Sequence, residues 1–446
     1  MPLQRCDAIG LGQRRAGYID RLGSALECRN PMRIDLRRYL ALLGAAPVLV
    51  LGFAFFGELR AENGGEHWVA AWATSVQPPN QRTVGAAATG FEDRSLRMIL
   101  RPTIGGGRLR LRICNSYGKF TLHLDDVRIA SRTSGPDIRP DSAHRVTFHD
   151  QTSIRIAAGA SAFSDAVPLA AIGGEDLAVD LHLPFFSGPP TWHAEANRTS
   201  YISVRGNYAG VAHWDGAKPI LSWFFICGLD VAAPRNVRAV VLLGDSVTDG
   251  ARSSIDSAAD WPSSLARRLA EAGRKDIAII NAGISGNRLL DGGGVGDSAL
   301  SRFDRDVLAV PGASTVILLE GGNDIGTAPP LMQPTIGAAA IIDAYRELIR
   351  RAHAAGLRII AGTLTATGGS GYGTPPKQAE RQIVNAWLHQ LAGRPGGFDA
   401  VVDFDAALRD PAQPDRLRPA FDSGDHLHPN DAGYRAMAAA VDLGLL

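Results

Sequence analysis

The sequence predicts two folded parts in series, an antiparallel β-sandwich followed by an α/β domain built on a parallel sheet. Over residues 67–230, short stretches alternate apolar and polar side chains, which is the period of half-buried strands. Over residues 236–446, continuous apolar runs of strand length alternate with segments of helical spacing. This second pattern is typical of a parallel sheet with helices on both faces. The chain has 446 residues, of which 45% are hydrophobic, so it is long enough to bury two cores.

Residues 1–60 predict a targeting segment rather than a folded domain. Arg33, Arg37 and Arg38 precede a nearly unbroken apolar run over residues 39–57, which is the pattern of a secretory signal or an N-terminal anchor. The run is about long enough to span a bilayer, and no clean small-x-small cleavage site follows it. We therefore expect export, either with a cleaved signal peptide or with an uncleaved membrane anchor that leaves the protein facing outward.

Charge and cysteine usage narrow the class of protein further. Basic and acidic residues number 46 and 45, so nothing in the charge balance calls for a nucleic-acid partner. Cys6 and Cys28 precede the apolar run, whereas Cys114 and Cys227 follow it. Cys114 and Cys227 could pair in an oxidising compartment, with two buried free thiols as the alternative. No Cys-x-x-Cys or Cys/His cluster indicates zinc.

The first folded part contains several strand patterns. Leu96–Leu100 and Leu109–Ile113 alternate in polarity and flank three glycines at 105–107, which predicts a hairpin. Further strands are expected at Val127–Ala130, Ser153–Ile156, Leu177–Leu183 and Trp223–Cys227. No convincing helical stretch interrupts them, which favours a sandwich. Four aromatic side chains belong either to its core or to a ligand platform: Trp192, His193, Tyr201 and Trp214.

The second folded part alternates strands and helices. Strands are expected at Val237–Leu243, Ile277–Ile280, Thr315–Leu319, Leu357–Ala361 and Ala400–Val402. Helices are expected at Trp261–Ala272, Ser298–Leu308, Ile336–Ala355, Lys377–Leu391 and Asp431–Val441. Ligands of such folds bind beyond the carboxyl ends of the strands. A functional site is therefore expected in the loops that follow the strands.

The loop after the first of these strands, Gly244–Gly250, holds a serine at the mouth of a helix. A tight turn there exposes the Ser246 hydroxyl and has backbone N–H groups nearby to receive an oxyanion. The alternative is that Ser246, Thr248 or Asp249 only caps the helix.

Two further loops offer hydrogen-bond donors. Gly286, after the second strand, lets the backbone approach a ligand closely and direct its N–H toward it. Asn323, after the third strand, has a side-chain amide that can donate to a developing negative charge. Each loop is also of ordinary turn composition, which is the alternative for both.

A histidine and an aspartate lie before the last expected helix. His428 can serve as a general base near neutral pH, and Asp425 is close enough in sequence to fix its tautomer. His426 is the rival base, but it is too near Asp425 in sequence for the carboxylate to turn easily onto its ring. Metal binding by both histidines and Asp425 is a further alternative, which is disfavoured because no other cluster completes the site. We expect no metal or cofactor.

In this order on the strand ends, the four loops resemble the conserved blocks of the SGNH hydrolases, also called the GDSL lipase/esterase family. The matching residues are Gly244–Ser246, Gly286, Gly321–Asp324 and Asp425–His428. The resemblance covers roughly residues 238–446 and implies a flavodoxin-like, three-layer α/β/α fold with a five-stranded parallel sheet. More loosely, Trp68–Gln77 and Arg110–Asn115 look like the extra N-terminal β domain of some bacterial multidomain SGNH esterases.

The resemblance implies a role for each site residue. Ser246 would be the nucleophile, His428 the base that takes its proton, and Asp425 the group that orients His428. The oxyanion hole would consist of the backbone N–H groups of Ser246 and Gly286 and the side chain of Asn323.

These roles predict hydrolysis of carboxylic esters through an acyl-enzyme. No long apolar lid segment is present in the sequence, which favours short acyl groups such as acetyl, on a small molecule or on carbohydrate. The loop Gly368–Pro376 could shape the pocket. The alternatives are a lipase or lysophospholipase, an acyltransferase with the same triad, and a non-catalytic envelope protein that binds polysaccharide.

Overall fold

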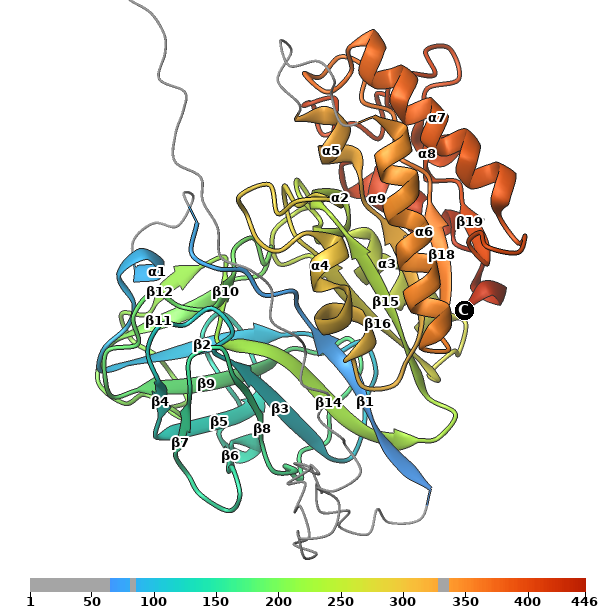
Figure 1. Cartoon of the computed structure of the whole chain (residues 1–446). Helices are drawn as coiled ribbons and strands as arrows, with labels where there is room; N and C mark the ends of the chain where they lie inside the picture. The colour runs from blue at the N-terminus through green and yellow to red at the C-terminus, as the bar shows by residue number, and fades with distance from the viewer. Residues whose placement is uncertain (1–64, 81–85, 328–336) are drawn as a thin grey trace, which may run out of the picture. The chain divides into compact units, whose positions relative to one another are not determined.

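A computed structural model describes residues 65–80, 86–327 and 337–446 (Figure 1). The predicted targeting segment 1–60, its apolar run and both upstream cysteines, Cys6 and Cys28, lie outside the described residues. The described residues belong to one compact unit of the chain, Arg60–Leu446. No helix among them combines the length and the apolar character needed to cross a membrane.

The N-terminal half consists of antiparallel sheets, which confirms the predicted β-sandwich. A four-stranded sheet has the order β1 (Glu66–Ala73), β14 (Ile226–Pro234), β3 (Leu109–Cys114), β8 (Ser161–Phe163). A six-stranded sheet has the order β12 (Lys218–Ile220), β11 (Ser200–Arg205), β2 (Arg94–Leu100), β9 (Leu177–Leu183), β5 (Asp126–Ser131), β6 (His144–Val146). Two-stranded pairs add β4 (Leu122–Leu124) with β7 (Ile154–Ile156), and β10 (Trp192–His193) with β13 (Trp223–Phe224). A short helix, α1 (Ala86–Thr89), lies between β1 and β2.

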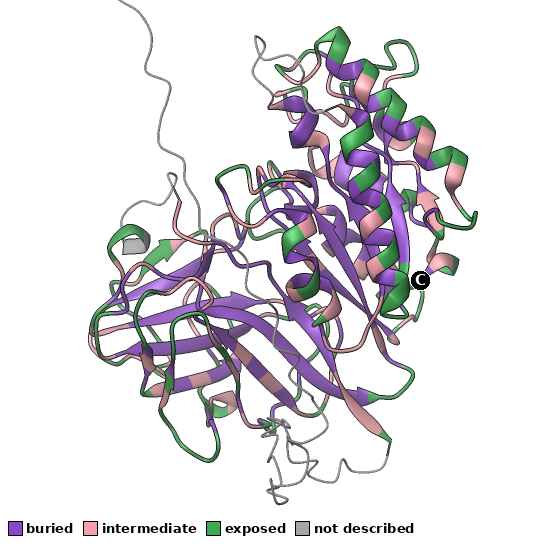
Figure 2. Ribbon diagram, viewed as in Figure 1, coloured by how far each residue is buried: buried purple, intermediate pink, exposed green. Residues whose placement is uncertain are grey.

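The core of this half follows from the alternation of side chains. In β3, Leu109, Leu111 and Ile113 are fully buried, whereas the arginines between them are partly exposed. Side chains of β2 and β9 from the other sheet belong to the same apolar cluster, as the purple strands of Figure 2 illustrate. The four aromatic side chains that could have formed a ligand platform, Trp192, His193, Tyr201 and Trp214, are all buried.

The predicted hairpin between residues 96–100 and 109–113 is wrong. β2 pairs with β9 and β11, while β3 pairs with β14 and β8, so the two strands lie in different sheets. Alternating polarity reports which face of a strand is buried but carries no information about its partner. A glycine-rich connection suits a crossing between sheets as well as a hairpin turn.

The C-terminal half confirms the predicted α/β fold. Its five strands run parallel in the order β16 (Ile277–Gly283), β15 (Arg238–Gly244), β17 (Ala313–Leu319), β18 (Arg358–Gly362), β19 (Ala400–Val402). In chain order this is 2-1-3-4-5, the flavodoxin-like order. The main helices are α3 (Trp261–Glu271), α4 (Ala299–Phe303) continued by a π-helical turn (Asp304–Leu308), α6 (Ala338–Ala354), α7 (Pro375–Leu391) and α9 (Asp431–Ala440).

Helices on both faces explain the continuous apolar strands. α3 packs on α9 and α6 packs on α7, and β15 is buried along almost its entire length. Three short helices follow strand ends: α2 (Ser246–Asp249), α5 (Gly322–Gly326) and α8 (Phe404–Leu408). The sequence indicated a helix beginning near Ser246 but neither of the other two.

The two halves are in direct contact along the middle of the chain. Only Arg235, Asn236 and Val237 separate β14 from β15, and β1 lies against β16. His67 Nε2 donates a hydrogen bond to Val237 O at 3.0 Å, near the amino end of β15. Thr103 Oγ1 accepts one from Ile279 N at 3.0 Å, in the middle of β16.

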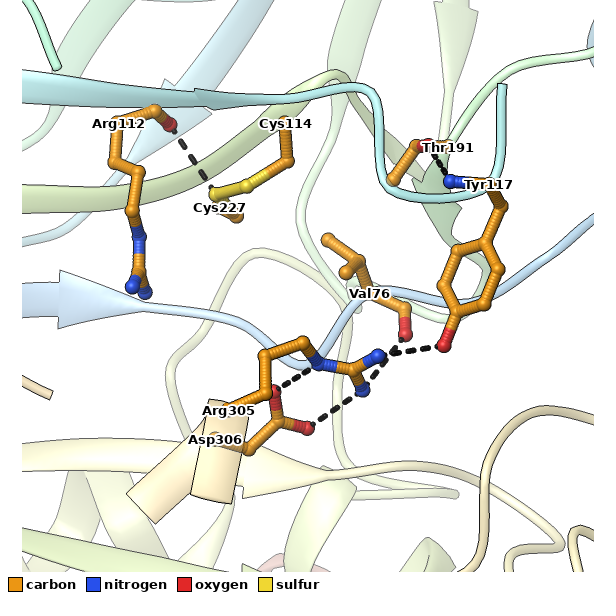
Figure 3. The surroundings of a disulfide bond; sticks show 8 residues. All are labelled: Val76, Arg112, Cys114, Tyr117, Thr191, Cys227, Arg305 and Asp306. Atoms are coloured by element: carbon orange, nitrogen blue, oxygen red, sulfur yellow. Dashed lines mark hydrogen bonds and ion pairs between the residues drawn. A yellow bond between two sulfur atoms is a disulfide. The ribbon is translucent and has the colours of Figure 1, made fainter. Parts of the chain in front are cut away.

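Cys114 and Cys227 form a disulfide, which resolves the alternatives that the sequence left open (Figure 3). The two residues lie on the neighbouring strands β3 and β14, and their Cα atoms are 6.0 Å apart. Figure 3 also shows Arg305 from the C-terminal half reaching Tyr117 and Val76 in the loops beside this bond.

We predict that the double substitution Cys114→Ala and Cys227→Ala lowers the free energy of unfolding by roughly 2–5 kcal/mol. The bond closes a loop of 113 residues, so its loss increases the conformational entropy of the unfolded chain. Denaturant unfolding of both proteins, with and without a thiol reductant, measures the difference. Reductant should shift the midpoint of the wild type alone, and an unchanged wild-type midpoint after complete reduction would contradict the prediction.

Candidate active site

The four predicted loops meet because of the sheet topology. β15, β16 and β17 are adjacent and parallel, so the loops that follow them leave the same edge of the sheet. The segment before α9 reaches that edge as well, since His428 contacts Ser246 there.

Ser246 is the first residue of the short helix α2, and only Asp245 separates it from the end of β15. Asp245 is the N-cap, and its Oδ1 accepts the Val247 N–H at 2.9 Å. The capping alternative for Ser246 is therefore wrong, because its hydroxyl is not the group that caps the helix. A side chain at Gly244 would collide with Thr248 and with the carbonyl of Leu319, so only glycine allows this sharp turn.

Ser246, His428 and Asp425 form a continuous chain of hydrogen bonds. Ser246 Oγ lies 2.9 Å from His428 Nε2, and His428 Nδ1 lies 2.7 Å from Asp425 Oδ2. The other oxygen of Asp425 accepts the backbone N–H groups of Leu427 and His428, at 3.0 and 2.8 Å. Since Asp425 holds the hydrogen on Nδ1, the lone pair of Nε2 faces the serine hydroxyl.

Asp425 is ionised in this setting. Partial burial raises its pKa, but the hydrogen bonds from the backbone and ring of His428 outweigh this effect and hold the pKa well below its ordinary value. Arg252 Nε, 3.2 Å from Asp425 Oδ2, adds a positive charge on the solvent side.

His426 does not reach Ser246. Its Nδ1 lies 2.6 Å from Asp422 Oδ2, and half of its side chain is exposed to solvent. Within the part of the chain that the structure describes, no group of three or more His, Cys, Asp or Glu side chains has the geometry to hold a metal ion.

The three predicted oxyanion donors differ in whether they already have hydrogen-bond partners. Gly286 adopts a φ of +81°, and among the described residues neither its N–H nor that of Ser246 has a hydrogen-bond partner. Asn323 is already engaged, since its Nδ2 donates to Asn287 O at 2.8 Å and to Asp245 Oδ2 at 3.3 Å.

Tyr372, which the sequence reasoning did not identify, fixes the orientation of the Asn323 amide. Its hydroxyl donates to Asn323 Oδ1 at 3.1 Å, so the amide nitrogen is turned toward Asp245. Tyr372 belongs to the loop Gly368–Pro376, which was expected to shape the pocket. An isolated tyrosine in a glycine-rich loop gives no local signal of this role.

A small cavity of about 40 Å³ adjoins Ser246. Ser246, Asn323 and Tyr372 line it together with apolar side chains, namely Leu319, Ile325, Leu364 and Leu427. Lys377 also reaches the cavity, and its Nζ donates to Gly326 O at 2.6 Å. Lys377 lies in the first turn of α7, where the helix dipole disfavours a cation, and this mismatch is the signal that sequence analysis could have used.

A larger cavity of about 440 Å³ lies between the two halves, away from the Ser246–His428–Asp425 hydrogen bonds. Its walls include Trp72, Trp223, His193 and Asp249, but neither Ser246 nor His428. The hydrogen-bond chain therefore identifies the candidate active site better than cavity size does.

Three carboxyl groups near Ser246 are buried: Asp245, Glu320 and Asp324. Burial raises the pKa of Asp245 to about 6, although the Val247 N–H opposes the shift. Burial and the charge of Asp245 raise the pKa of Glu320 well above its ordinary value, and neither Glu320 oxygen has a hydrogen-bond partner among the described residues. Burial likewise raises the pKa of Asp324, whose oxygens accept the N–H groups of Leu289 and Leu290.

We predict that Asp245→Asn removes part of the pH dependence of stability. The unfolded carboxyl loses its proton near pH 3.8 and the folded one near 6, so the folded state binds more protons between these values. The contribution of Asp245 to the free energy of unfolding should therefore fall by roughly 2 kcal/mol as pH rises from about 4 to about 6.

The amide introduced by Asp245→Asn retains an oxygen for the capping hydrogen bond, so the variant should show a shallower fall over the same range. Denaturant unfolding at a series of pH values measures both slopes. Asp442→Asn, the same substitution at an exposed N-cap, controls for the chemical change. Equal slopes in wild type and Asp245→Asn would show that Asp245 does not titrate in this way.

Comparison with known proteins gives one family match. Residues 242–436 match the model of the GDSL-like lipase/acylhydrolase family, and this range contains all the predicted site residues. The chain matches none of the curated proteins with which it was compared.

Several solved structures are similar to part of this chain. A lipase/acylhydrolase from Enterococcus faecalis is 23% identical, with 46% of this chain and 93% of that one covered and a TM-score of 0.36. A variant of an acetyl xylan esterase from Geobacillus stearothermophilus is 22% identical, with 46% and 94% covered and a TM-score of 0.36. A GDSL-like lipase from Bacteroides thetaiotaomicron is 18% identical, with 46% and 85% covered and a TM-score of 0.32.

Proposed function

We propose that this protein is a hydrolase that cleaves carboxylic esters with Ser246 as nucleophile, in keeping with the match of residues 242–436 to the GDSL-like lipase/acylhydrolase family model. The observation that carries the proposal is the unbroken chain from Ser246 Oγ through His428 to Asp425, with links of 2.9 and 2.7 Å. A protein that only binds polysaccharide needs no such alignment of hydroxyl, imidazole and carboxylate.

The mechanism follows from which atom holds each proton. His428 Nε2 accepts the Ser246 proton while Oγ attacks the ester carbonyl, and Asp425 stabilises the imidazolium that forms. The imidazolium then gives the proton to the departing alkoxide, which leaves an acyl-enzyme. Water enters, transfers a proton to Nε2 and attacks the acyl carbon. The imidazolium then returns that proton to Ser246 Oγ as the bond to the acyl group breaks, which releases the carboxylic acid and regenerates Ser246.

Two kinds of donor stabilise the negative charge on the carbonyl oxygen. The N–H groups of Ser246 and Gly286 have no competing partner among the described residues. Asn323 Nδ2 has two hydrogens, of which one makes a 3.3 Å bond to Asp245 Oδ2 and the other a 2.8 Å bond to Asn287 O. When the oxyanion forms, it accepts the first hydrogen in place of Asp245, and the bond to Asn287 O stays in place. Tyr372 keeps the amide nitrogen on this side throughout.

The proposed substrates are esters of short acyl groups, acetyl above all, on small molecules or carbohydrate. The cavity beside Ser246 measures about 40 Å³, which suits a group of few atoms and opposes a long fatty acyl chain. This property distinguishes the proposal from a lipase or lysophospholipase.

The proposed location is outside the cytoplasm. The basic flank and apolar run at residues 33–57 are the pattern of an export signal or anchor. The disulfide between Cys114 and Cys227 is compatible with an oxidising compartment.

We predict that Ser246→Ala abolishes the burst of p-nitrophenol from p-nitrophenyl acetate and lowers turnover by roughly 10⁴–10⁶-fold. The methyl group cannot form the acyl-enzyme, so the two-step reaction is lost. Ser257→Ala is the matched control, because the Ser257 hydroxyl lies at the surface and donates only to Ser254 O. An organophosphonate should label the wild type and the control but not Ser246→Ala; wild-type turnover in Ser246→Ala would exclude Ser246 as the nucleophile.

We further predict that kcat/KM for p-nitrophenyl esters is highest for acyl chains of about two to four carbons and falls steadily toward sixteen, because longer chains do not fit the small cavity. A series of esters of increasing length, assayed below their critical micelle concentrations, measures this profile. A maximum at the long esters would favour a lipase and contradict the short-acyl proposal without affecting the role of Ser246.

A further inference from the structure

A buried histidine of the β-sandwich is hydrogen-bonded to the loop of the nucleophile. His193, in β10, has only 2% of its surface exposed. Its Nδ1 lies 2.8 Å from Ser75 O, within its own half, and its Nε2 lies 3.0 Å from Asp249 Oδ1, in the other half. The Ser75 carbonyl can only accept, so Nδ1 carries a hydrogen, and a protonated ring donates a second hydrogen from Nε2 to the Asp249 carboxylate.

The charge of this ring is consistent with its surroundings. Burial lowers the pKa of His193, but the charge and hydrogen bond of Asp249, together with the Ser75 carbonyl, outweigh burial and raise it. The pair is almost completely shielded from water, with side-chain exposures of 3% and 5%. Loss of one member would leave the other charge buried and unpaired, which proteins tolerate poorly.

Asp249 transmits this contact to the oxyanion loop. Its second oxygen, Oδ2, accepts the backbone N–H of Ser285 at 2.8 Å and the Ser285 hydroxyl at 2.7 Å. Ser285 immediately precedes Gly286, and Asp249 is the last residue of the helix that begins at Ser246. One buried carboxylate therefore joins β10, the nucleophile helix and the loop that holds a proposed oxyanion donor.

A second buried side chain, from the C-terminal half, also connects the segment around Ser75 with the strands that precede the site loops. Arg302, in α4, is almost fully buried and donates to Ser75 Oγ at 2.8 Å and to Ala282 O at 2.7 Å. It also donates to Gly244 O at 2.9 Å, directly before the nucleophile turn. The segment around Ser75 is thus linked to Asp249 through His193, and to the carboxyl ends of β15 and β16 through Arg302.

We propose that His193 is a positioning residue for the proposed ester hydrolysis, which acts through Asp249 and Ser285 to hold the Gly286 N–H where the oxyanion forms. The inference rests on the proposed function of Ser246. It assigns the β-sandwich a part in the chemical step, in addition to any part in binding substrate.

The test compares two histidines of the β-sandwich in the full-length chain. His193→Leu removes the contact at the carboxyl end of the sheet. His67→Leu is the matched control, because His67 also hydrogen-bonds across the two halves, but at the amino end of β15. kcat and KM for p-nitrophenyl acetate and the thermal unfolding midpoint are measured for each variant, with Ser246→Ala as the inactive reference.

For His193→Leu we expect kcat to fall by about 10–100-fold, less than the loss expected on deleting an oxyanion donor outright. KM should change little, since the contact lies outside the acyl cavity. His193→Gln, whose amide can still donate to Asp249, should recover part of kcat. His67→Leu should keep the wild-type kcat even if its unfolding midpoint falls.

A second comparison tests whether His193 acts through Asp249 and Ser285. Ser285→Ala alone should lower kcat, and combining it with His193→Leu should cost less than the product of the two single effects, because both act on one loop. If His193→Leu fails to fold, His193→Gln and Ser285→Ala decide the question by the same kcat and KM criteria.

A folded His193 variant with wild-type kcat, or one whose loss lies only in KM, would overturn the positioning role. Ser246→Ala would remain inactive in that case, so the proposed hydrolase would stand. An active Ser246→Ala would instead overturn the proposed function itself.

Discussion

The register of three adjacent parallel strands controls the geometry of the candidate site. β15, β16 and β17 end at one edge of the sheet, and Ser246, Gly286 and Asn323 each follow one of these strands. A shift of one strand by a single residue would move the site residue that follows it by about 3.3 Å, more than a hydrogen bond tolerates. The continuous burial of β15 between two layers of helices prevents such a shift, because slipping would expose apolar side chains on both faces.

The electrostatics of the site separate its carboxyl groups into two sets. Asp425 accepts backbone N–H groups and the imidazole, which hold its pKa low and keep it charged. Asp245 and Glu320 lie deeper, and burial raises the pKa of both. Environment rather than residue type therefore decides which acid supports the base.

The sequence predicted the fold class, the five parallel strands and the loops that carry the candidate site, because burial on both faces leaves continuous apolar runs and loops at strand ends leave short local motifs. It could not predict which strands pair, and the hairpin assigned between Leu96–Leu100 and Leu109–Ile113 was wrong. Nor did it identify Tyr372 beside Asn323, or the contact of His193 with Asp249, which are 56 residues apart. Such contacts depend on tertiary packing and have no periodic signature in the chain.

The contact between Ser246 and His428 spans 182 residues of sequence. During synthesis the serine leaves the ribosome long before the histidine exists, and the imidazole reaches it only after the final helix has docked. Until then Ser246 has no imidazole beside it, so a nascent or truncated chain lacks this contact. The order of synthesis therefore delays assembly of the hydrogen-bond chain until residues 425–428 have been made and placed.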